Sequence, residues 1–156
     1  MKDKKYKLGY TAGVFDMFHI GHLNILKRAK KQCERLMVAV TLDRVVWEYK
    51  NKRPIIPFEE RVEIIAAVRY VDIVVPQPNR DKIRAWEKFG FDALFVGDDW
   101  KGDPLYEKTE EKFKKHGIDV VYFSYTEGIS STKLTRRLDE LNERNILEKK
   151  LMDPVG

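Results

Sequence analysis

The sequence predicts an α/β protein with a doubly wound parallel sheet of five strands and helices on both faces. Two observations support this: short apolar runs alternate with longer amphipathic runs along the chain, and no repeat or Gly/Ser linker interrupts them. Strands that alternate with helices form parallel sheets through right-handed crossovers. We therefore expect a single domain over residues 1–156, with a core at about 6–138 and a C-terminal helix and tail at about 139–156.

Five short runs have the apolar composition of strands that are buried on both faces of a sheet. In chain order they are Tyr6–Ala12, Arg35–Thr41, Val71–Val75, Ala93–Gly97 and Ile118–Ser124. Such an arrangement is Rossmann-like, and its ligands bind beyond the carboxyl ends of the strands, where the winding reverses. Functional residues are therefore expected directly after strands.

The segments between these strands place apolar residues at helical spacing. One predicted helix has Leu23, Leu26 and Ala29 on one side, and Cys33 at its end is expected to pack as a small hydrophobic residue. Helices are predicted at Gly21–Cys33, Phe58–Arg69, Asp81–Phe89 and Pro104–His116, and from Ser130 into the Glu140s. The segment "EYKNKRP" (Glu48–Pro54) is expected to be a basic loop.

The composition excludes several classes of protein. Apolar residues make up 43% and charged residues 35% of the chain, which fits a globular domain rather than a disordered one. No apolar run is long enough for a membrane span, and the basic N-terminus lacks the apolar part of a signal peptide. A single cysteine fits a reducing cytoplasm. The net charge of +5 predicts an anionic partner, but no aromatic platform or recognition helix indicates nucleic acid.

Two of the three histidines lie directly after the first predicted strand, in "GVFDMFHIGH" (Gly13–His22). His19 and His22 are three residues apart at the start of a helix, so their imidazoles face the same way. Gly21 leaves room for a ligand to approach the backbone, and the helix N-terminus supplies free N–H groups. The pattern predicts a phosphate site. Capping and metal binding are the alternatives, and the lack of an adjacent acidic or thiol ligand disfavours a metal.

A second predicted helix N-terminus follows the last strand, in "YTEGISSTK" (Tyr125–Lys133). Gly128 permits a tight turn, and three consecutive hydroxyl residues begin the helix. Ordinary N-capping requires only one hydroxyl. The run therefore also indicates phosphate coordination, with the two helix N-termini holding one polyphosphate between them.

Four motifs together resemble the cytidylyltransferases, most closely the bacterial glycerol-3-phosphate cytidylyltransferases, over about Tyr6–Leu138. They are "GVFDMFHIGH", "RYVD" (Arg69–Asp72), "GDDW" (Gly97–Trp100) and "TEGISSTK". The resemblance implies transfer of CMP from CTP to a small phosphorylated alcohol, first of all glycerol 3-phosphate, to give a CDP-alcohol and pyrophosphate. It also implies Mg²⁺ held mainly by the nucleotide phosphates, a homodimer, and a cytoplasmic role in making precursors of cell-surface polymers.

The same resemblance assigns residues to the site. Catalytic roles are implied for His19, His22, Lys50 and Arg69. Contacts with the nucleotide are implied for Val14, Phe15, His19, Ile20, Gly21, His22, Lys52, Tyr125, Thr126, Glu127, Gly128, Ile129, Ser130, Ser131 and Thr132. Contacts with the acceptor are implied for Asp16, Lys50, Lys82 and Asp99. Since a phosphate monoester is already a dianion near pH 7, the reaction requires in-line placement and charge neutralisation rather than a general base.

Other interpretations remain open. The family usually begins its last motif with arginine, where this chain has Tyr125, so the nucleotide is held differently, a neighbouring cation compensates, or the acceptor differs. Asp16 and Asp99 could instead cap helices or serve the structure. The activity could also be that of a FAD synthase-like adenylyltransferase, or of a cytidylyltransferase acting on another phosphorylated polyol or amino alcohol. A non-catalytic nucleotide sensor is disfavoured by the intact histidines and lysines.

Overall fold

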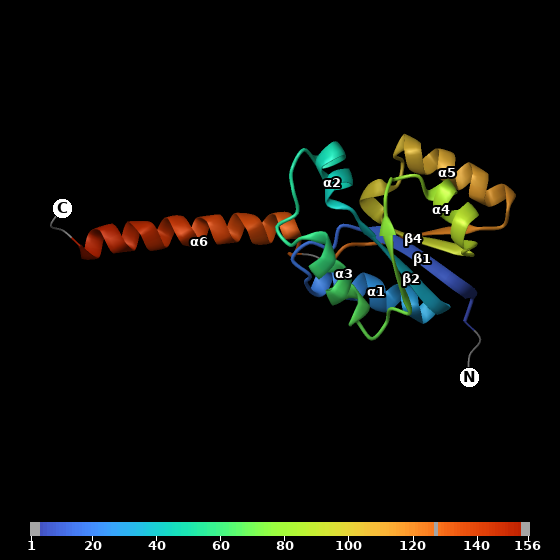
Figure 1. Ribbon diagram of the computed structural model, residues 1–156, viewed down its shortest axis with the longest axis horizontal. Helices are drawn as coiled ribbons and strands as arrows, with labels where there is room; N and C mark the ends of the chain where they lie inside the picture. Colours follow the sequence, from blue (N-terminus) through green and yellow to red (C-terminus); the bar gives the residue numbers. More distant parts are fainter. Residues whose placement is uncertain (1–3, 127, 154–156) are drawn as a thin grey trace.

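A computed structural model describes residues 4–126 and 128–153 of the chain. Its five strands are all parallel and form one sheet in the order β3–β2–β1–β4–β5, which confirms the predicted fold class (Figure 1). The strands are β1 (Tyr6–Gly13), β2 (Cys33–Thr41), β3 (Ile73–Gln77), β4 (Ala93–Gly97) and β5 (Asp119–Phe123). The winding reverses between β1 and β4, so ligands are expected beyond the carboxyl ends of these two strands.

The helices cover both faces of this sheet. They are α1 (Ile20–Gln32), α2 (Asp43–Lys50), α3 (Phe58–Ala66), α4 (Lys82–Phe89), α5 (Pro104–Lys115) and α6 (Ser131–Met152), with a 3-10 turn η1 (Asp98–Trp100) after β4. Helix α2 was not predicted. It buries Val45 and Val46, which are adjacent rather than at helical spacing, so no helical periodicity is visible in this segment. Lys50, expected in a loop, is therefore the last residue of a helix.

Two element boundaries also differ from the prediction. Helix α3 ends at Ala66, and β3 begins at Ile73 rather than Val71. The residues between them form a turn in which the Val71 N–H donates to the Val68 carbonyl at 3.0 Å. The Asp72 carboxylate then accepts from the Leu36 N–H at 2.7 Å and from the Lys30 ammonium. The "RYVD" motif is therefore mostly a turn at the amino end of β3.

Side chains that alternate along each strand divide the core between the two faces of the sheet. On one face, Phe95 packs with Leu26 of α1 and Ile65 of α3. On the other, Leu94 packs with Phe113 of α5. The core thus fixes α1 and α3 below one face and α4 and α5 above the other (Figure 1).

Cys33 is fully buried at the end of α1, as predicted. Its thiol donates to the Ala29 carbonyl at 3.3 Å. A Cβ added at Gly9 would lie 2.8 Å from its sulfur and 2.5 Å from the Phe95 ring. Strand β1 therefore requires glycine at position 9, where the side chains of Cys33 and Phe95 pack against its backbone.

Helix α6 extends away from the rest of the molecule (Figure 1). None of its residues is buried, and Leu138, Leu141 and Leu151 are all exposed. Among the residues that the structure describes, no helix is both long enough and apolar enough to cross a membrane.

Candidate active site

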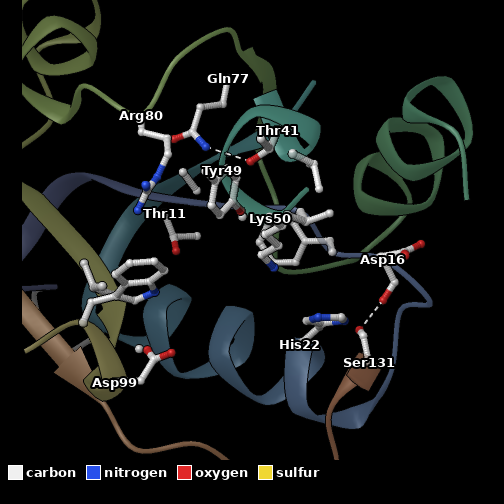
Figure 2. A pocket seen from close by; sticks show the side chains of 18 of the residues that line it. Thr11, Asp16, His22, Thr41, Tyr49, Lys50, Gln77, Arg80, Asp99 and Ser131 are labelled. Atoms are coloured by element: carbon white, nitrogen blue, oxygen red, sulfur yellow. Dashed lines mark hydrogen bonds between the residues drawn. The ribbon is translucent and has the colours of Figure 1, made fainter. Parts of the chain in front are cut away.

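A cavity of about 270 Å³ lies at the carboxyl edge of the sheet, where the winding reverses (Figure 2). Five cationic side chains and two carboxylates line it: Lys50, Lys52, Arg53, Arg80 and Lys82, and Asp16 and Asp99. The excess of positive charge indicates an anionic ligand. Its floor is formed by the ends of strands, including Thr11, Thr41 and Gln77.

The two histidines cap the N-terminus of α1 and each other. The Nδ1 atom of His19 accepts from the Gly21 N–H at 3.0 Å, and the Nδ1 atom of His22 accepts from the His19 N–H at 3.3 Å. The two rings stack with centroids 3.8 Å apart. The capping interpretation is therefore correct, and it also fixes how the imidazoles are oriented toward a ligand.

This capping determines where each ring carries its proton. A neutral imidazole has one donor and one acceptor nitrogen, and both Nδ1 atoms are acceptors here, so the proton lies on Nε2 in both rings. Burial, together with the neighbouring His19, lowers the pKa of His22 to about 3, and burial also lowers the pKa of His19. At neutral pH both rings are uncharged hydrogen-bond donors through Nε2.

Aromatic rings enclose His22. The Phe15 ring meets it edge-on and the Phe18 ring stacks on it, each with centroids 5.5 Å apart. The connection from β1 to α1 that places these rings holds Phe15 and Met17 at positive φ, 54° and 48°, which non-glycine residues seldom adopt. Such conformations persist where the surroundings demand them, and they cluster at functional sites.

Gly21 has a different use from the one that the sequence suggested. A Cβ at this position would lie 2.8 Å from Cε1 of His19 and 3.4 Å from the Ile129 side chain. The space is filled by the capping imidazole and by the segment that leads into α6, not left open for a ligand. Glycine is thus needed so that the N-termini of α1 and α6 can pack closely together.

Asp16 joins the segments around the cavity. Its carboxylate accepts from the backbone N–H groups of Ile55 and Ile56 at 2.8 and 2.9 Å, and its carbonyl accepts from the Ser131 hydroxyl at 2.6 Å (Figure 2). The carboxylate lines the cavity, but both of its oxygens are already engaged. Its observed contacts are therefore those of the structural alternative.

Arg61 of α3 is a positioning residue that the sequence analysis missed. Its guanidinium is fully buried and donates to the carbonyls of Val14 and Ile56, at 2.7 and 2.9 Å, and to the Asp43 carboxylate at 2.5 Å. It therefore connects the histidine segment, the segment before α3 and the start of α2. Position 61 lies three residues after Phe58 and four before Ile65, on the buried face of the helix. The role was missed because arginine on an amphipathic helix normally faces solvent.

Tyr125 occupies the place of the expected arginine. Its hydroxyl donates to the Asp99 carboxylate at 2.8 Å, and burial and Asp99 raise its pKa. A Cβ added at Gly97 would lie within 3 Å of the tyrosine ring. The ring therefore lies directly on the end of β4 and contributes no positive charge.

The lysines of the site differ in burial. Lys50, the last residue of α2, is exposed as a whole, but partial burial of its ammonium and the nearby Lys52 lower its pKa. Lys82 is only 7% exposed and donates to Oε1 of Gln77 at 2.5 Å, and burial lowers its pKa to about 7.

Arg80 is a further lining residue that the sequence analysis did not weigh. Its guanidinium lies 4.4 Å from the centre of the Tyr49 ring and 5.0 Å from that of Trp100. These three residues come from separate segments, so no local motif could have indicated the arrangement.

The structure brings most of the predicted site residues to this cavity. Those that line it are Val14, Phe15, Asp16, His22, Lys50, Lys52, Lys82, Asp99, Tyr125, Ser131 and Thr132. A second group is adjacent to lining residues in sequence or space: the His19 ring stacks on His22, the Ser130 hydroxyl accepts from the Lys133 N–H at 3.0 Å, and the Thr126 hydroxyl accepts from Asn24 at 3.0 Å. Ile20 and Gly21 begin α1, Gly128 has a φ of 78° in the turn before α6, and Glu127 lies outside the described residues.

Arg69 is the exception. It is exposed in the turn before β3, at the amino edge of the sheet, where its guanidinium lies 5.8 Å from the Tyr70 ring. The cavity lies at the opposite edge and does not include it. The catalytic role expected for Arg69 is therefore not supported, because α3 ends early and the motif precedes its strand instead of following one.

Comparisons with known proteins agree with this geometry. A family model described as cytidylyltransferase-like matches residues 10–137. The chain is similar to a glycerol-3-phosphate cytidylyltransferase of Staphylococcus aureus, at 35% identity over 82% of this chain and 92% of the relative. It is also similar to a FAD synthase of Thermococcus kodakarensis, at 31% identity over 90% and 97%. A solved lipopolysaccharide core biosynthesis protein of Thermoplasma volcanium matches with a TM-score of 0.65 and 27% identity, over 78% of this chain and 97% of that one.

Proposed function

We propose a specific activity from one premise: the chain belongs to the cytidylyltransferase-like family and is a nucleotidyltransferase. The activity is transfer of CMP from CTP to a small phosphorylated alcohol, with glycerol 3-phosphate as the first choice. The products are a CDP-alcohol and pyrophosphate. Similarity to two glycerol-3-phosphate cytidylyltransferases, each at 35% identity, supports this choice.

The observation that carries the proposal is the meeting of two helix N-termini at one cationic cavity. The start of α1 contributes the His22 imidazole, and the start of α6 contributes Ser131 and Thr132. The positive ends of two helix dipoles suit a triphosphate. The Nε2–H groups of the two neutral imidazoles supply directed donors, and the lysines supply charge.

These groups suit attack by one phosphate on another. An oxygen of the acceptor phosphate forms a bond to the α-phosphorus of CTP, and the bond from that phosphorus to the bridging oxygen breaks to release pyrophosphate. The attacking group is already anionic, so no base is required. The rate enhancement comes from alignment and from donors directed at oxygens that gain charge in the transition state. We assign His19 and His22 to those oxygens, and Lys50 to the acceptor phosphate.

We propose that Mg²⁺ enters with the CTP phosphates. Among the residues that the structure describes, no three or more His, Cys, Asp or Glu side chains come together as a metal site. Asp16 has both oxygens engaged by backbone N–H groups, and Asp99 accepts from Tyr125. When bound, Mg²⁺ would neutralise charge on the nucleotide phosphates.

A FAD synthase-like adenylyltransferase is the second candidate, because relatives of that name match this chain almost as well. The "TEGIS" segment at α6 favours CTP. The deciding experiment measures pyrophosphate release from each of the four nucleoside triphosphates with Mg²⁺, across a panel of phosphorylated alcohols and FMN. We expect turnover with CTP and a phosphorylated polyol. Turnover confined to ATP with FMN would contradict the proposal and establish the alternative.

We also propose a homodimer. The exposed leucines of α6 are apolar surface that a second copy of the chain would bury. Sedimentation velocity at assay concentration measures the mass directly, and a monomer would contradict this proposal.

A further inference from the structure

Arg80, on the connection from β3 to α4, and Lys82, the first residue of α4, lie together at one end of the cavity. Figure 2 shows Arg80 and Gln77 on the side away from His22 and Ser131, with Tyr49 and Lys50 between them. The two cations therefore lie beyond the place where Lys50 would meet the acceptor phosphate. Groups at this end would contact the alcohol part of the acceptor.

Neither cation has a carboxylate partner in the part of the chain that the structure describes. Lys82 donates to the Gln77 amide, whose nitrogen in turn donates to the Thr41 hydroxyl at 2.7 Å. The carboxylate between the two cations, Asp81, is engaged by the backbone N–H groups of Ile83 and Arg84 at 3.0 and 3.1 Å. Two basic side chains two residues apart thus lie together without a carboxylate in direct contact, and burial together with Arg80 lowers the pKa of Lys82 to about 7. A ligand that provides oxygen acceptors would favour the charged form of Lys82.

Arg80 also fills an aromatic cage. The rings of Tyr49 and Trp100 flank its guanidinium, with centroids 4.4 and 5.0 Å away. Paired aromatic rings of this kind are how proteins bind quaternary ammonium groups. In this chain the cage already holds the protein's own cation, so a choline-like group would meet both a filled cage and the positive charge of Arg80.

We infer that Arg80, supported by Lys82, determines acceptor specificity: this end of the cavity takes a hydroxylated or anionic head group and excludes an ammonium or trimethylammonium one. The inference rests on the proposed function, and it narrows the acceptor from phosphorylated polyols or amino alcohols to polyols or acids. Hydroxyl oxygens accept hydrogen bonds from the guanidinium and from the Lys82–Gln77–Thr41 chain. An ammonium group supplies no acceptor and is repelled.

The test compares kcat/KM for glycerol 3-phosphate and phosphocholine, with CTP, in the wild type and in Arg80→Ala. The wild type should strongly prefer glycerol 3-phosphate. Removing Arg80 empties the cage. The ratio of kcat/KM for glycerol 3-phosphate to that for phosphocholine should therefore fall by about tenfold or more, because the first value decreases and the second increases. Arg80→Lys keeps the positive charge and should keep the exclusion. Arg84→Ala removes a charge from the exposed face of α4, outside the cavity, and should change nothing.

An unchanged preference in Arg80→Ala, or equal use of both acceptors by the wild type, would overturn the inference. Titration calorimetry with phosphocholine in the presence of CTP gives a second measurement that needs no turnover. Binding should be weak in the wild type and stronger in Arg80→Ala, and equal binding would also overturn the inference. If the wild type turns over no phosphorylated alcohol, the proposed function fails, and the titration still decides the role of Arg80.

Discussion

At the end of the cavity where α1 and α6 begin, polar groups are held by their neighbours: His19 and His22 cap each other, and Ser131 is bonded to Asp16. At the other end, the described contacts of both basic side chains are with neutral groups: Arg80 lies against the rings of Tyr49 and Trp100, which come from distant segments, and Lys82 donates to the amide of nearby Gln77. The first end is ordered before any substrate arrives, as transition-state stabilisation requires. The second carries charge that a ligand must satisfy, which suits recognition of one substrate among several.

The largest effect should follow changes at the preorganised end. We expect His22→Ala, and separately His19→Ala, to lower kcat by at least about 100-fold, because each removes a donor that acts on the transition state. Circular dichroism checks that each variant is folded. His116→Ala removes the remaining histidine, which lies outside the cavity, and serves as the control. Near-normal turnover in either site variant would contradict the assignment of that histidine to the transition state.

Changes at the acceptor side should act chiefly on binding. We expect Lys50→Ala and Lys82→Met each to raise the KM for the acceptor by about tenfold while the KM for CTP changes little. Lys27→Ala, on the exposed face of α1, is the matched control. If either variant raised the KM for CTP instead, that lysine would belong to the nucleotide end.

Tyr125 provides a smaller and more specific test, because its ring lies against Gly97 and its hydroxyl donates to Asp99. Tyr125→Arg introduces the positive charge that the resemblance led us to expect at this position. We expect a several-fold change in the KM for CTP and an unchanged ranking of acceptors. Altered acceptor ranking with an unchanged KM for CTP would place Tyr125 on the acceptor side.

The smallest effect concerns stability toward acid. Burial lowers the pKa of His22 to about 3 in the folded protein, against 6.5 normally. Below pH 6.5 the unfolded chain therefore binds a proton that the folded chain does not, so the free energy of unfolding falls as the pH falls toward 3. We expect the free energy of unfolding to fall by about 1 kcal/mol between pH 6.5 and 5. This is about half of the change that the full pKa shift would give, because His22 is partly exposed to solvent. Urea unfolding across this range should show less loss in His22→Gln, and equal loss in both proteins would contradict the assignment.

The same contrast explains what the sequence could predict. The histidine and "TEGIS" segments are contiguous, follow strands and begin helices, so their position in an α/β fold could be worked out from the residues. The cage of Tyr49, Arg80 and Trp100 assembles only when three separate segments fold, and each residue alone resembles an ordinary surface or core side chain. Helix α2 was missed because its buried residues are adjacent. The buried role of Arg61 was missed because arginine normally faces solvent, although its position shares a helix face with Ile65.

Helix α6 has a practical consequence for handling the protein. Its 22 residues, at 1.5 Å per residue, make a rod about 33 Å long that begins at the cavity with Ser131 and Thr132. A fluorophore or a surface linker attached at the far end of this rod would lie roughly 30 Å from the phosphate chemistry. Immobilisation through that end should therefore leave the mouth of the cavity open to substrate, whereas attachment near Tyr125 would obstruct it.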